Sequence, residues 1–167
     1  MDCDPGIDDG IALAYAAAHQ DEIELLAVTT FAGNQTIDKV TKNALELVDF
    51  YGLKVPVARG QERPLVKEVI HAEEFHGETG LGHCVLPETG TKAASDNAVF
   101  FIREILDDLP EGQQVTFIET APMTNLALLL RVFPEVKDKI RRIVFMGGAV
   151  KGGNVTPAAE FNIYADP

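Results

Sequence analysis

The stretch Ile-Glu-Leu-Leu-Ala-Val-Thr-Thr-Phe at residues 23–31 is the clearest indicator of the fold class of this chain. It is nearly continuous in apolar and β-branched residues, a pattern typical of a strand that is buried on both faces. Such strands occur in parallel sheets that have helices on both sides. The sequence therefore predicts an α/β protein with a parallel sheet at its centre.

The flanking segments continue this alternation of strand and helix patterns. The predicted helices cover residues 9–19, residues 36–51, a segment that Ser95 caps and that ends before Pro110, and residues 123–132. The other predicted strands cover residues 55–58, 115–120 and 142–146. Residues 60–90 have no sustained period, and we expect a long functional loop there. The alternation predicts a parallel, Rossmann-like sheet covered by helices and a single domain over residues 1–167.

Composition narrows the class of protein. The chain has 167 residues, of which 46% are hydrophobic, so it is long enough to bury a core. Its formal net charge of −12 argues against nucleic acid and anionic membranes as partners. Two cysteines are too few for a disulfide scaffold, and no apolar run is long enough to cross a membrane. We therefore expect a cytoplasmic protein.

Four aspartates crowd into the first nine residues, Met-Asp-Cys-Asp-Pro-Gly-Ile-Asp-Asp. Like charges packed this closely repel each other unless some are protonated or a divalent cation neutralises them. Pro5 fixes one backbone dihedral of the turn, which limits how far the carboxylates can spread. Oxygen ligands favour Ca²⁺ or Mg²⁺, so the segment predicts a hard-cation site. The alternative is a solvated acidic turn that begins a helix.

Polar side chains also follow several of the predicted strands. Because the carboxyl ends of parallel strands meet at one edge of a sheet, we expect these side chains to form one polar pocket. Taken singly, Asn34 beside Gly33 is also compatible with a simple turn, and Thr120 and Asn125 with capping of the next helix. The residues concerned are Asn34, Thr120, Asn125, Asn154, Glu160 and Asn162.

An ordered set of motifs resembles the inosine-uridine-preferring nucleoside hydrolases over essentially the whole chain. The segments that carry the resemblance are Asp-Cys-Asp-Pro-Gly-Ile-Asp-Asp at 2–9, Thr-Thr-Phe-Ala-Gly-Asn at 29–34, His-Gly-Glu-Thr-Gly at 76–80, Thr-Ala-Pro-Met-Thr-Asn at 120–125, Met-Gly-Gly at 146–148 and Glu-Phe-Asn at 160–162. The resemblance implies hydrolysis of the N-glycosidic bond of small-molecule ribonucleosides, with roles in nucleoside catabolism and salvage, and a homo-oligomeric full-length form.

The resemblance also implies roles for individual residues. It implies a Ca²⁺ held by the carboxylates of Asp4 and Asp9 and the main-chain carbonyl of Thr120. Asp4 would in addition be the general base for a water that the cation acidifies.

The substrate-binding roles come from the same resemblance. Asp8 and Asn162 would hold the ribose 2′ and 3′ hydroxyls, with help from Asn34. Asn154 and Glu160 would bind the 5′ hydroxyl. His76 would lie near the base as a catalytic residue; the alternative is a loop histidine with no catalytic part.

Two departures from the family pattern lead to further expectations. Only Met1 precedes Asp2, where family members have a strand, so we expect a sheet that lacks its central strand and exposes backbone groups on both neighbours. Family members continue past Pro167 with another aspartate ligand and a histidine near the leaving group. We therefore expect this chain to hold an N-terminal part of the family domain, with an incomplete catalytic set.

Two other classes of protein compete with this interpretation. Asp2-Cys3-Asp4 resembles the nucleophile and acid pair of haloacid dehalogenase-type phosphatases, although Gly6 replaces the expected Thr or Val. The second alternative is a catalytically incompetent remnant that keeps a ribose and metal site or binds a partner.

Overall fold

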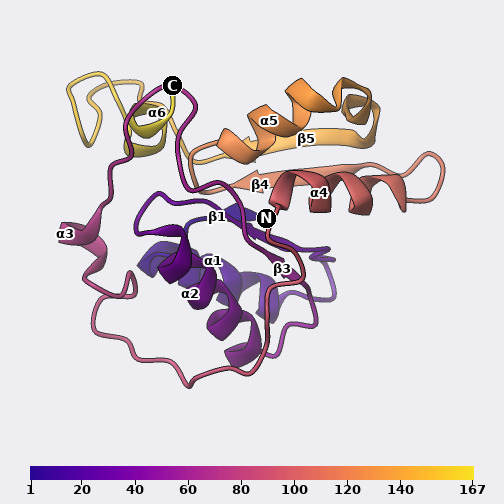
Figure 1. Ribbon diagram of the computed structural model, residues 1–167, viewed down its shortest axis with the longest axis horizontal. Helices are drawn as coiled ribbons and strands as arrows, with labels where there is room; N and C mark the ends of the chain where they lie inside the picture. Colours follow the sequence, from indigo (N-terminus) through magenta and orange to yellow (C-terminus); the bar gives the residue numbers. More distant parts are fainter.

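The computed structural model describes residues 1–167, and a five-stranded parallel sheet in the order β3-β2-β1-β4-β5 runs through it (Figure 1). The strands are β1 (Asp2–Cys3), β2 (Val28–Thr30), β3 (Val57–Ala58), β4 (Val115–Glu119) and β5 (Ile140–Phe145). All strand pairs are parallel. The α/β fold class predicted from the sequence is confirmed.

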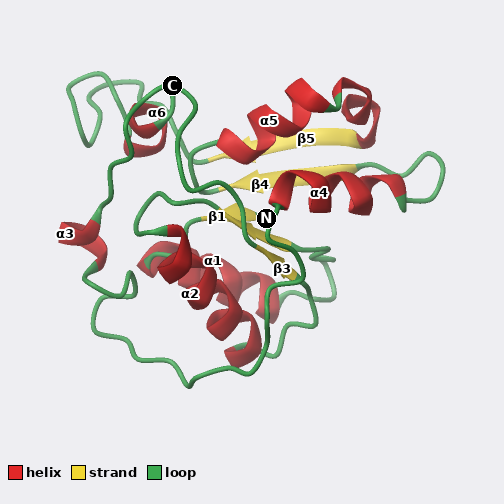
Figure 2. Ribbon diagram, in the orientation of Figure 1, coloured by secondary structure: helices red, strands yellow, loops and turns green.

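Helices connect the strands and cover them from two sides (Figure 2). They are α1 (Ile7–Ala18), α2 (Ile37–Phe50), α3 (Glu73–His76), α4 (Ala98–Asp107), α5 (Thr124–Val132), the 3₁₀ helix η1 (Pro134–Lys139) and α6 (Phe161–Ala165). No helix is both long and apolar enough to cross a bilayer.

The core has two main parts, one on each side of the sheet. On one side, Leu13 of α1 and Leu47 of α2 pack with Cys3 and Val28. On the other side, helices α4, α5 and η1 pack with Phe117 of β4. The order of strands and helices therefore places β1 at the centre of the sheet, with its carboxyl end free for a site.

The expectation that the sheet lacks a central strand is wrong. Asp2 and Cys3 form β1, which pairs with β2 on one side and β4 on the other. The amino group of Met1 donates to the carbonyl of Ala27 at 2.9 Å, and its carbonyl accepts from the amide of Thr29 at 2.9 Å. β2 thus finds main-chain partners along its length, whereas β4 pairs with β1 only at Glu119, so the expected exposure of backbone groups holds for the rest of β4 on this side.

Several element boundaries differ from the predicted ones for local reasons. The strand expected over 23–31 is confined to 28–30, where β1 offers it a partner. Helix α1 begins at Ile7 rather than Asp9, because the carboxylate of Asp9 accepts from the amide of Gly6, the N-cap residue, at 3.1 Å. The predicted cap at Ser95 is wrong: Asn97 caps α4 by accepting from the amide of Phe100.

The predicted long loop is the connection from β3 to α4, which contains only the short helix α3 (Figure 2). Helix α6 and η1 have no counterpart among the predicted elements, since five or six residues are too few to show a helical period. Glu160 is the N-cap of α6; its Oε2 accepts from the amide of Asn162 at 3.0 Å.

Candidate active site

A cleft of about 280 Å³ lies at the carboxyl ends of the strands. This volume is just below the usual range for small-ligand sites, roughly 300–1,000 Å³. Seven residues that the sequence singles out line it: Asp8, Asn34, His76, Thr120, Asn154, Glu160 and Asn162. The structure thus brings together side chains that are up to 154 positions apart in the sequence, between Asp8 and Asn162.

Asp4 and Asp9 lie buried beside this cleft, each with 1% of its surface exposed. The Oδ2 of Asp4 accepts from the amide of Asn34 at 2.7 Å, and the Oδ1 of Asp9 accepts from the hydroxyl of Thr120 at 2.5 Å. These bonds hold the two carboxylates between the loops that follow β2 and β4. Two residues that line the cleft, Asn34 and Thr120, are therefore hydrogen-bonded directly to the buried acids.

The electrostatic environment opposes two negative charges here. Burial raises the pKa of Asp9 to about 6, against the opposing effect of the bond from Thr120. Burial also raises the pKa of Asp4 well above its usual range, and the charge of Asp9 raises it further. A bound divalent cation would favour the ionised form of both groups.

A hydrogen bond joins Asn162 to Thr120, the residue that contacts Asp9. The side-chain Nδ2 of Asn162 donates to the main-chain carbonyl oxygens of Thr120, at 2.8 Å, and Met146, at 2.9 Å. Since a carbonyl oxygen has two lone pairs, that of Thr120 keeps one for another partner. The Oδ1 of Asn162 keeps its full acceptor capacity for a ligand.

His76 closes another side of the cleft. Its Nδ1 accepts from the amide of Ile7 at 3.2 Å, which places the proton of the neutral ring on Nε2. A side chain at Gly6 would overlap the His76 ring, and one at Gly33 would overlap the Asp4 carboxylate. Glycine at these two positions lets the loops approach closely enough to build the cleft.

The remaining predicted ligand-binding residues differ in their exposure and in the hydrogen bonds that they already make within the protein. Asp8 and Asn154 are exposed, whereas Glu160 is partly buried and spends Oε2 on capping α6. Asn34 is 7% exposed and donates from Nδ2 to the carbonyl of Asp4 at 3.0 Å. Its Oδ1 has no protein partner there and is available as an acceptor.

Asp2 does not belong to the cation group predicted from the acidic run. Its carboxylate accepts from the hydroxyl of Thr29 at 2.5 Å and from Nδ2 of Asn125 at 3.0 and 3.2 Å. It is 1% exposed and points to the side of the sheet that carries α5. A nucleophile must reach its substrate, so this position of Asp2 argues against the phosphatase interpretation. Asn125 donates to Asp2 and does not cap α5, because the N-cap residue of that helix is Met123.

Sequence reasoning missed a second buried acid next to Asp2. Glu119 lies opposite Asp2 in the β1–β4 pairing and is fully buried. Burial and the charge of Asp2 raise the pKa of Glu119 well above its usual range. Neither carboxyl oxygen of Glu119 has a hydrogen-bond partner, which favours the neutral form of this buried acid. This pair places two carboxyl groups between β1 and β4 at the centre of the sheet.

The cleft also has apolar walls that the sequence did not indicate. They are Ala72, Phe75, Met146, Val155 and Phe161. Phe75 lies in α3, which has only four residues, and Val155 lies in a loop, so no period marks either of them. Apolar walls beside a few fixed polar groups are typical of sites for small ligands.

Asp166 holds α6 in place against two other segments. Its Oδ2 accepts from the amide of Leu65 at 2.9 Å and from the hydroxyl of Thr124 at 2.5 Å. Nearby, Nζ of Lys67 donates to the carbonyl of Tyr164 at 2.6 Å and lies 3.7 Å from the centre of its ring. Since α6 carries Asn162, these contacts position one wall of the cleft.

Asp166→Ala is expected to loosen α6 locally, because it removes the acceptor of two hydrogen bonds, a loss of about 1–3 kcal/mol. Hydrogen exchange measured by mass spectrometry should be faster in residues 160–166 and little changed in α2. Asp138→Ala, at an exposed position, is the matched control. Equal exchange in the two variants would show that Asp166 does not position α6.

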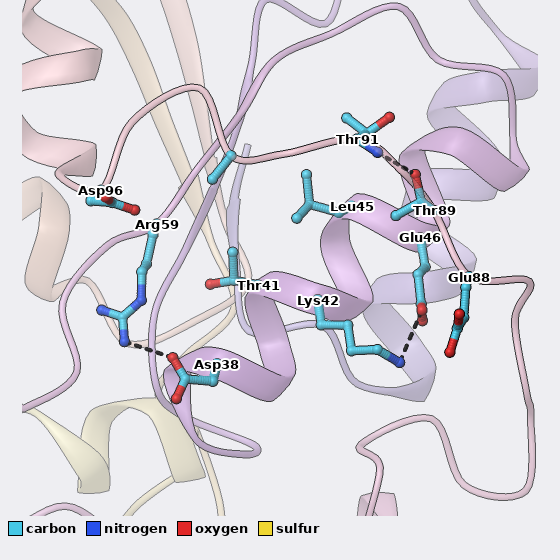
Figure 3. A pocket seen from close by; sticks show the side chains of 11 residues that line it. Asp38, Thr41, Lys42, Leu45, Glu46, Arg59, Glu88, Thr89, Thr91 and Asp96 are labelled. Carbon is cyan, nitrogen blue, oxygen red and sulfur yellow. Dashed lines mark hydrogen bonds and ion pairs between the residues drawn. The ribbon is translucent and has the colours of Figure 1, made fainter.

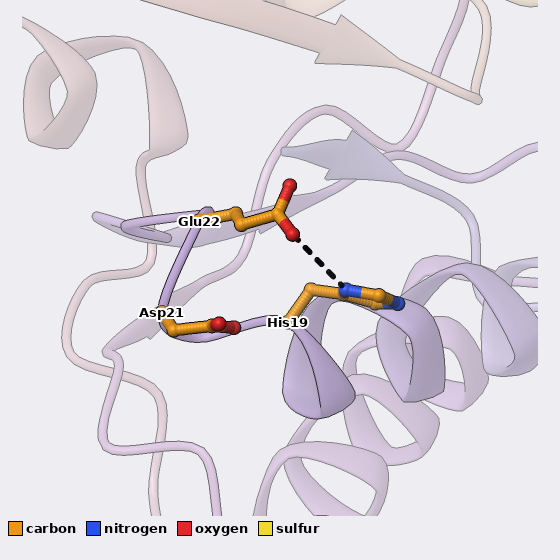
Figure 4. A group of neighbouring side chains, drawn as sticks. All are labelled: His19, Asp21 and Glu22. Atoms are coloured by element: carbon orange, nitrogen blue, oxygen red, sulfur yellow. Dashed lines mark ion pairs between the residues drawn. The ribbon is translucent and has the colours of Figure 1, made fainter.

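Two other features could be mistaken for the site. A hollow of about 380 Å³ lies between α2 and residues 88–96, but its cations are already paired: Arg59 with Asp38 and Lys42 with Glu46 (Figure 3). His19, Asp21 and Glu22 have ligand atoms within 4.8 Å of one another at the far end of α1 (Figure 4). This surface group is separated from Asp8 by roughly 16 Å of helix.

Comparison with known proteins identifies the family of this chain. The inosine-uridine preferring nucleoside hydrolase family matches residues 1–167. The pyrimidine-specific ribonucleoside hydrolase RihA of Salmonella typhimurium is 48% identical over the whole of this chain and 53% of its own length. The chain therefore spans about half the length of the curated relatives it matches.

Solved structures agree with this result. The purine-preferring ribonucleoside hydrolase of Gardnerella vaginalis superposes on 99% of this chain with a TM-score of 0.88 and 35% identity, over 54% of its own chain. A plant nucleoside hydrolase, PpNRh1, gives a TM-score of 0.90 at 35% identity, over 52% of its own chain. The chain belongs to the family of inosine-uridine preferring nucleoside hydrolases.

Proposed function

We propose that this chain forms the cation-binding and ribose-binding part of a ribonucleoside hydrolase, which breaks the N-glycosidic bond between ribose and base. The observation that carries the proposal is the cleft itself. Seven residues from separate segments converge on it, next to the buried acid pair Asp4 and Asp9. A polyhydroxylated ligand suits this arrangement, because vicinal hydroxyls donate to carboxylate and amide oxygens.

The donor set fits Ca²⁺. Asp4, Asp9 and the carbonyl of Thr120 offer only oxygen, which hard cations prefer. The raised pKa values of the two acids fit a site built for an added positive charge. Ca²⁺ takes six to eight oxygen ligands, so water, substrate hydroxyls and further groups would complete the shell. When bound, the cation supplies positive charge that acidifies water and holds hydroxyl oxygens.

The chain's own residues would divide the remaining work. Asp4, kept ionised by the bound cation, would accept a proton from the attacking water. Asp8, Asn34 and the free Oδ1 of Asn162 would orient the ribose 2′ and 3′ hydroxyls. The carboxylates of the site would stabilise the positive charge that develops on the sugar.

The rest of the cleft would orient the other parts of the substrate. Asn154 and Glu160 would hold the 5′ hydroxyl. His76, with its proton on Nε2, would lie beside the base. Pyrimidine nucleosides are the first substrates to test, because the curated relative at 48% identity is named pyrimidine-specific, whereas a purine-preferring structural relative is 35% identical.

Uridine and inosine hydrolysis, followed by the ultraviolet change with millimolar Ca²⁺, tests the proposal. The assay should use both this chain and a chimera that continues it with the part of the Salmonella relative outside the matched region. We expect Ca²⁺-dependent turnover by the chimera, faster with uridine, and much slower turnover by the chain itself. Ribose binding seen by saturation-transfer NMR without turnover in either protein would favour the remnant interpretation. No binding and no turnover would contradict both.

A further inference from the structure

Asn125 is a polar residue that the sequence singles out and that the proposed activity leaves without a role. It is fully buried, and it does not line the cleft. Its Nδ2 donates to the two carboxylate oxygens of Asp2, at 3.0 and 3.2 Å, and to the main-chain carbonyl of Thr30, at 2.9 Å. Its Oδ1 accepts from the amide of Gln61 at 3.0 Å. Both polar atoms of this side chain are therefore bound to other segments of the protein.

These contacts join three neighbouring strands. Asp2 begins β1, Thr30 ends β2, and Gln61 follows β3. β3, β2 and β1 are adjacent in the sheet, whereas Asn125 comes from α5, the helix that follows β4. The hydroxyl of Thr29 adds a further hydrogen bond to Asp2, at 2.5 Å. We use the name polar hub for Asp2, Thr29 and Asn125.

The residues of the candidate cation site come shortly after the strands that the polar hub joins. Asp4 is two residues beyond Asp2, and Asn34 is four residues beyond Thr30. The amide of Asn34 donates to Oδ2 of Asp4 at 2.7 Å, and its Nδ2 donates to the carbonyl of Asp4 at 3.0 Å. The amide of Thr120 donates to the carbonyl of Asp2 at 2.9 Å. The placement of these site residues therefore depends on how β1 and β2 are held.

The burial of the polar hub is costly, which indicates a role other than stability. Asp2 and Asn125 are both buried, and so is Glu119, which is paired with Asp2 and has no hydrogen-bond partner. Buried polar groups lose their hydration, and well-packed apolar side chains in their place are often as stable or more stable. A hydrogen-bonded network, however, has one preferred geometry. The hub can therefore set the spacing of β1 and β2 more closely than apolar packing could.

We propose that Asn125 is a positioning residue for the candidate cation site. By donating to Asp2 and Thr30 at once, it fixes the spacing of β1 and β2. This spacing brings Asp4 against Asn34. Asn125 itself contacts neither the cation nor the substrate. The consequence for cation binding rests on the function proposed above, whereas the consequence for the contact between Asp4 and Asn34 does not.

Asn125→Asp tests the proposal in the metal-free chain, because an ionised aspartate has nearly the same shape, cannot donate to Asp2 and is repelled by it. We expect hydrogen exchange in residues 31–36 to be about tenfold faster than in the wild type, with exchange in residues 40–48 of α2 unchanged. In the double variant Asp2→Asn/Asn125→Asp the donor and the acceptor change places. Exchange in residues 31–36 should then return to within about threefold of the wild-type rate. Leu129→Ala, at a buried site on the same helix, is the matched control for lost stability and should not accelerate residues 31–36 selectively.

Calorimetric titration of Ca²⁺ into the same proteins extends the test to the cation site. Asn125→Asp should weaken binding by about 10–100-fold, the usual cost of losing a group that orients a metal ligand. Its added negative charge alone would strengthen binding, so a loss distinguishes positioning from electrostatic attraction. A wild type that binds no Ca²⁺ would count against the function proposed above, and hydrogen exchange would still decide the role of Asn125.

Thr29→Val keeps the test decisive if Asn125→Asp does not fold. It removes one hydrogen bond to Asp2 with little change of shape, and it should accelerate exchange in residues 31–36 by about threefold. Unchanged exchange there in the folded hub variant would overturn the proposal. So would equal acceleration in Leu129→Ala, no recovery in the double variant, or wild-type Ca²⁺ affinity in Asn125→Asp.

Discussion

Asp4→Asn is expected to lower kcat for nucleoside hydrolysis by the chimera by about 10²–10⁴-fold, the usual cost of losing a general base. The change in KM should be much smaller, since Asp4 acts on the attacking water and the ribose hydroxyls are assigned to other residues. Steady-state ultraviolet assays with uridine at saturating Ca²⁺ measure both constants. The substitution keeps the size of the side chain and one acceptor oxygen, so the bond from the amide of Asn34 can persist.

Asn162→Ala is the comparison variant, because it distinguishes the loss of a substrate contact from the loss of the base. Asn162 lines the cleft and steadies the carbonyls of Thr120 and Met146. Its removal should therefore raise KM as well as lower kcat, because an interaction made in the ground state is lost. If Asp4→Asn left kcat unchanged, or changed only KM, the assignment of Asp4 as the base would be wrong.

Asp9→Asn is expected to stabilise the metal-free chain at pH 7.5 and to have little effect near pH 4. The folded pKa of Asp9 is about 6, against 3.8 for an ordinary aspartate. The folded state therefore binds more protons than the unfolded state between these values, and stability falls as pH rises through this window. Asparagine mimics the protonated acid. It removes a penalty of roughly 3 kcal/mol, offset by about 1 kcal/mol for one lost hydrogen bond.

Urea unfolding in EDTA at the two pH values measures this effect. Asp8→Asn is the matched control; this neighbour is exposed, so its substitution should change the free energy of unfolding by less than about 0.5 kcal/mol. Saturating Ca²⁺ should reverse the order at pH 7.5, because only the wild type gains the binding energy. A destabilised Asp9→Asn variant at pH 7.5 without metal would contradict the electrostatic account of the acid pair.

The alternation of elements was readable from the sequence because buried parallel strands and amphipathic helices leave strong patterns. Val115–Glu119 and Ile37–Phe50 fall within one residue of their predicted bounds for this reason. Where two residues of similar chemistry compete, pattern is not enough. Ser95 and Asn97 both suit an N-cap, and the structure uses Ser95 in a bridge to Ala58 and in a turn that accepts from the amide of Asn97.

The candidate site was only partly readable. The density of acids in the first nine residues indicated a cation site, and the family resemblance implied Asp4 and Asp9 as its ligands, but the density alone could not show that Asp2 faces the other side of the sheet. That distinction depends on the register with β4 and on Asn125, which is 123 residues away. The apolar walls of the cleft were not predicted, because α3 and α6, which carry Phe75 and Phe161, are too short to give a period.

The central claim is that Asp4 and Asp9 hold a divalent cation. Calorimetric titration of Ca²⁺ into the metal-free chain tests it most directly, with Asp9→Ala and Glu22→Ala as variants. Glu22 belongs to the separate surface group with His19 and Asp21, so its removal tests whether that group accounts for any binding. The account predicts one Ca²⁺ site per chain in the wild type and in Glu22→Ala, and none in Asp9→Ala. Equal Ca²⁺ affinity in the wild type and Asp9→Ala would contradict it.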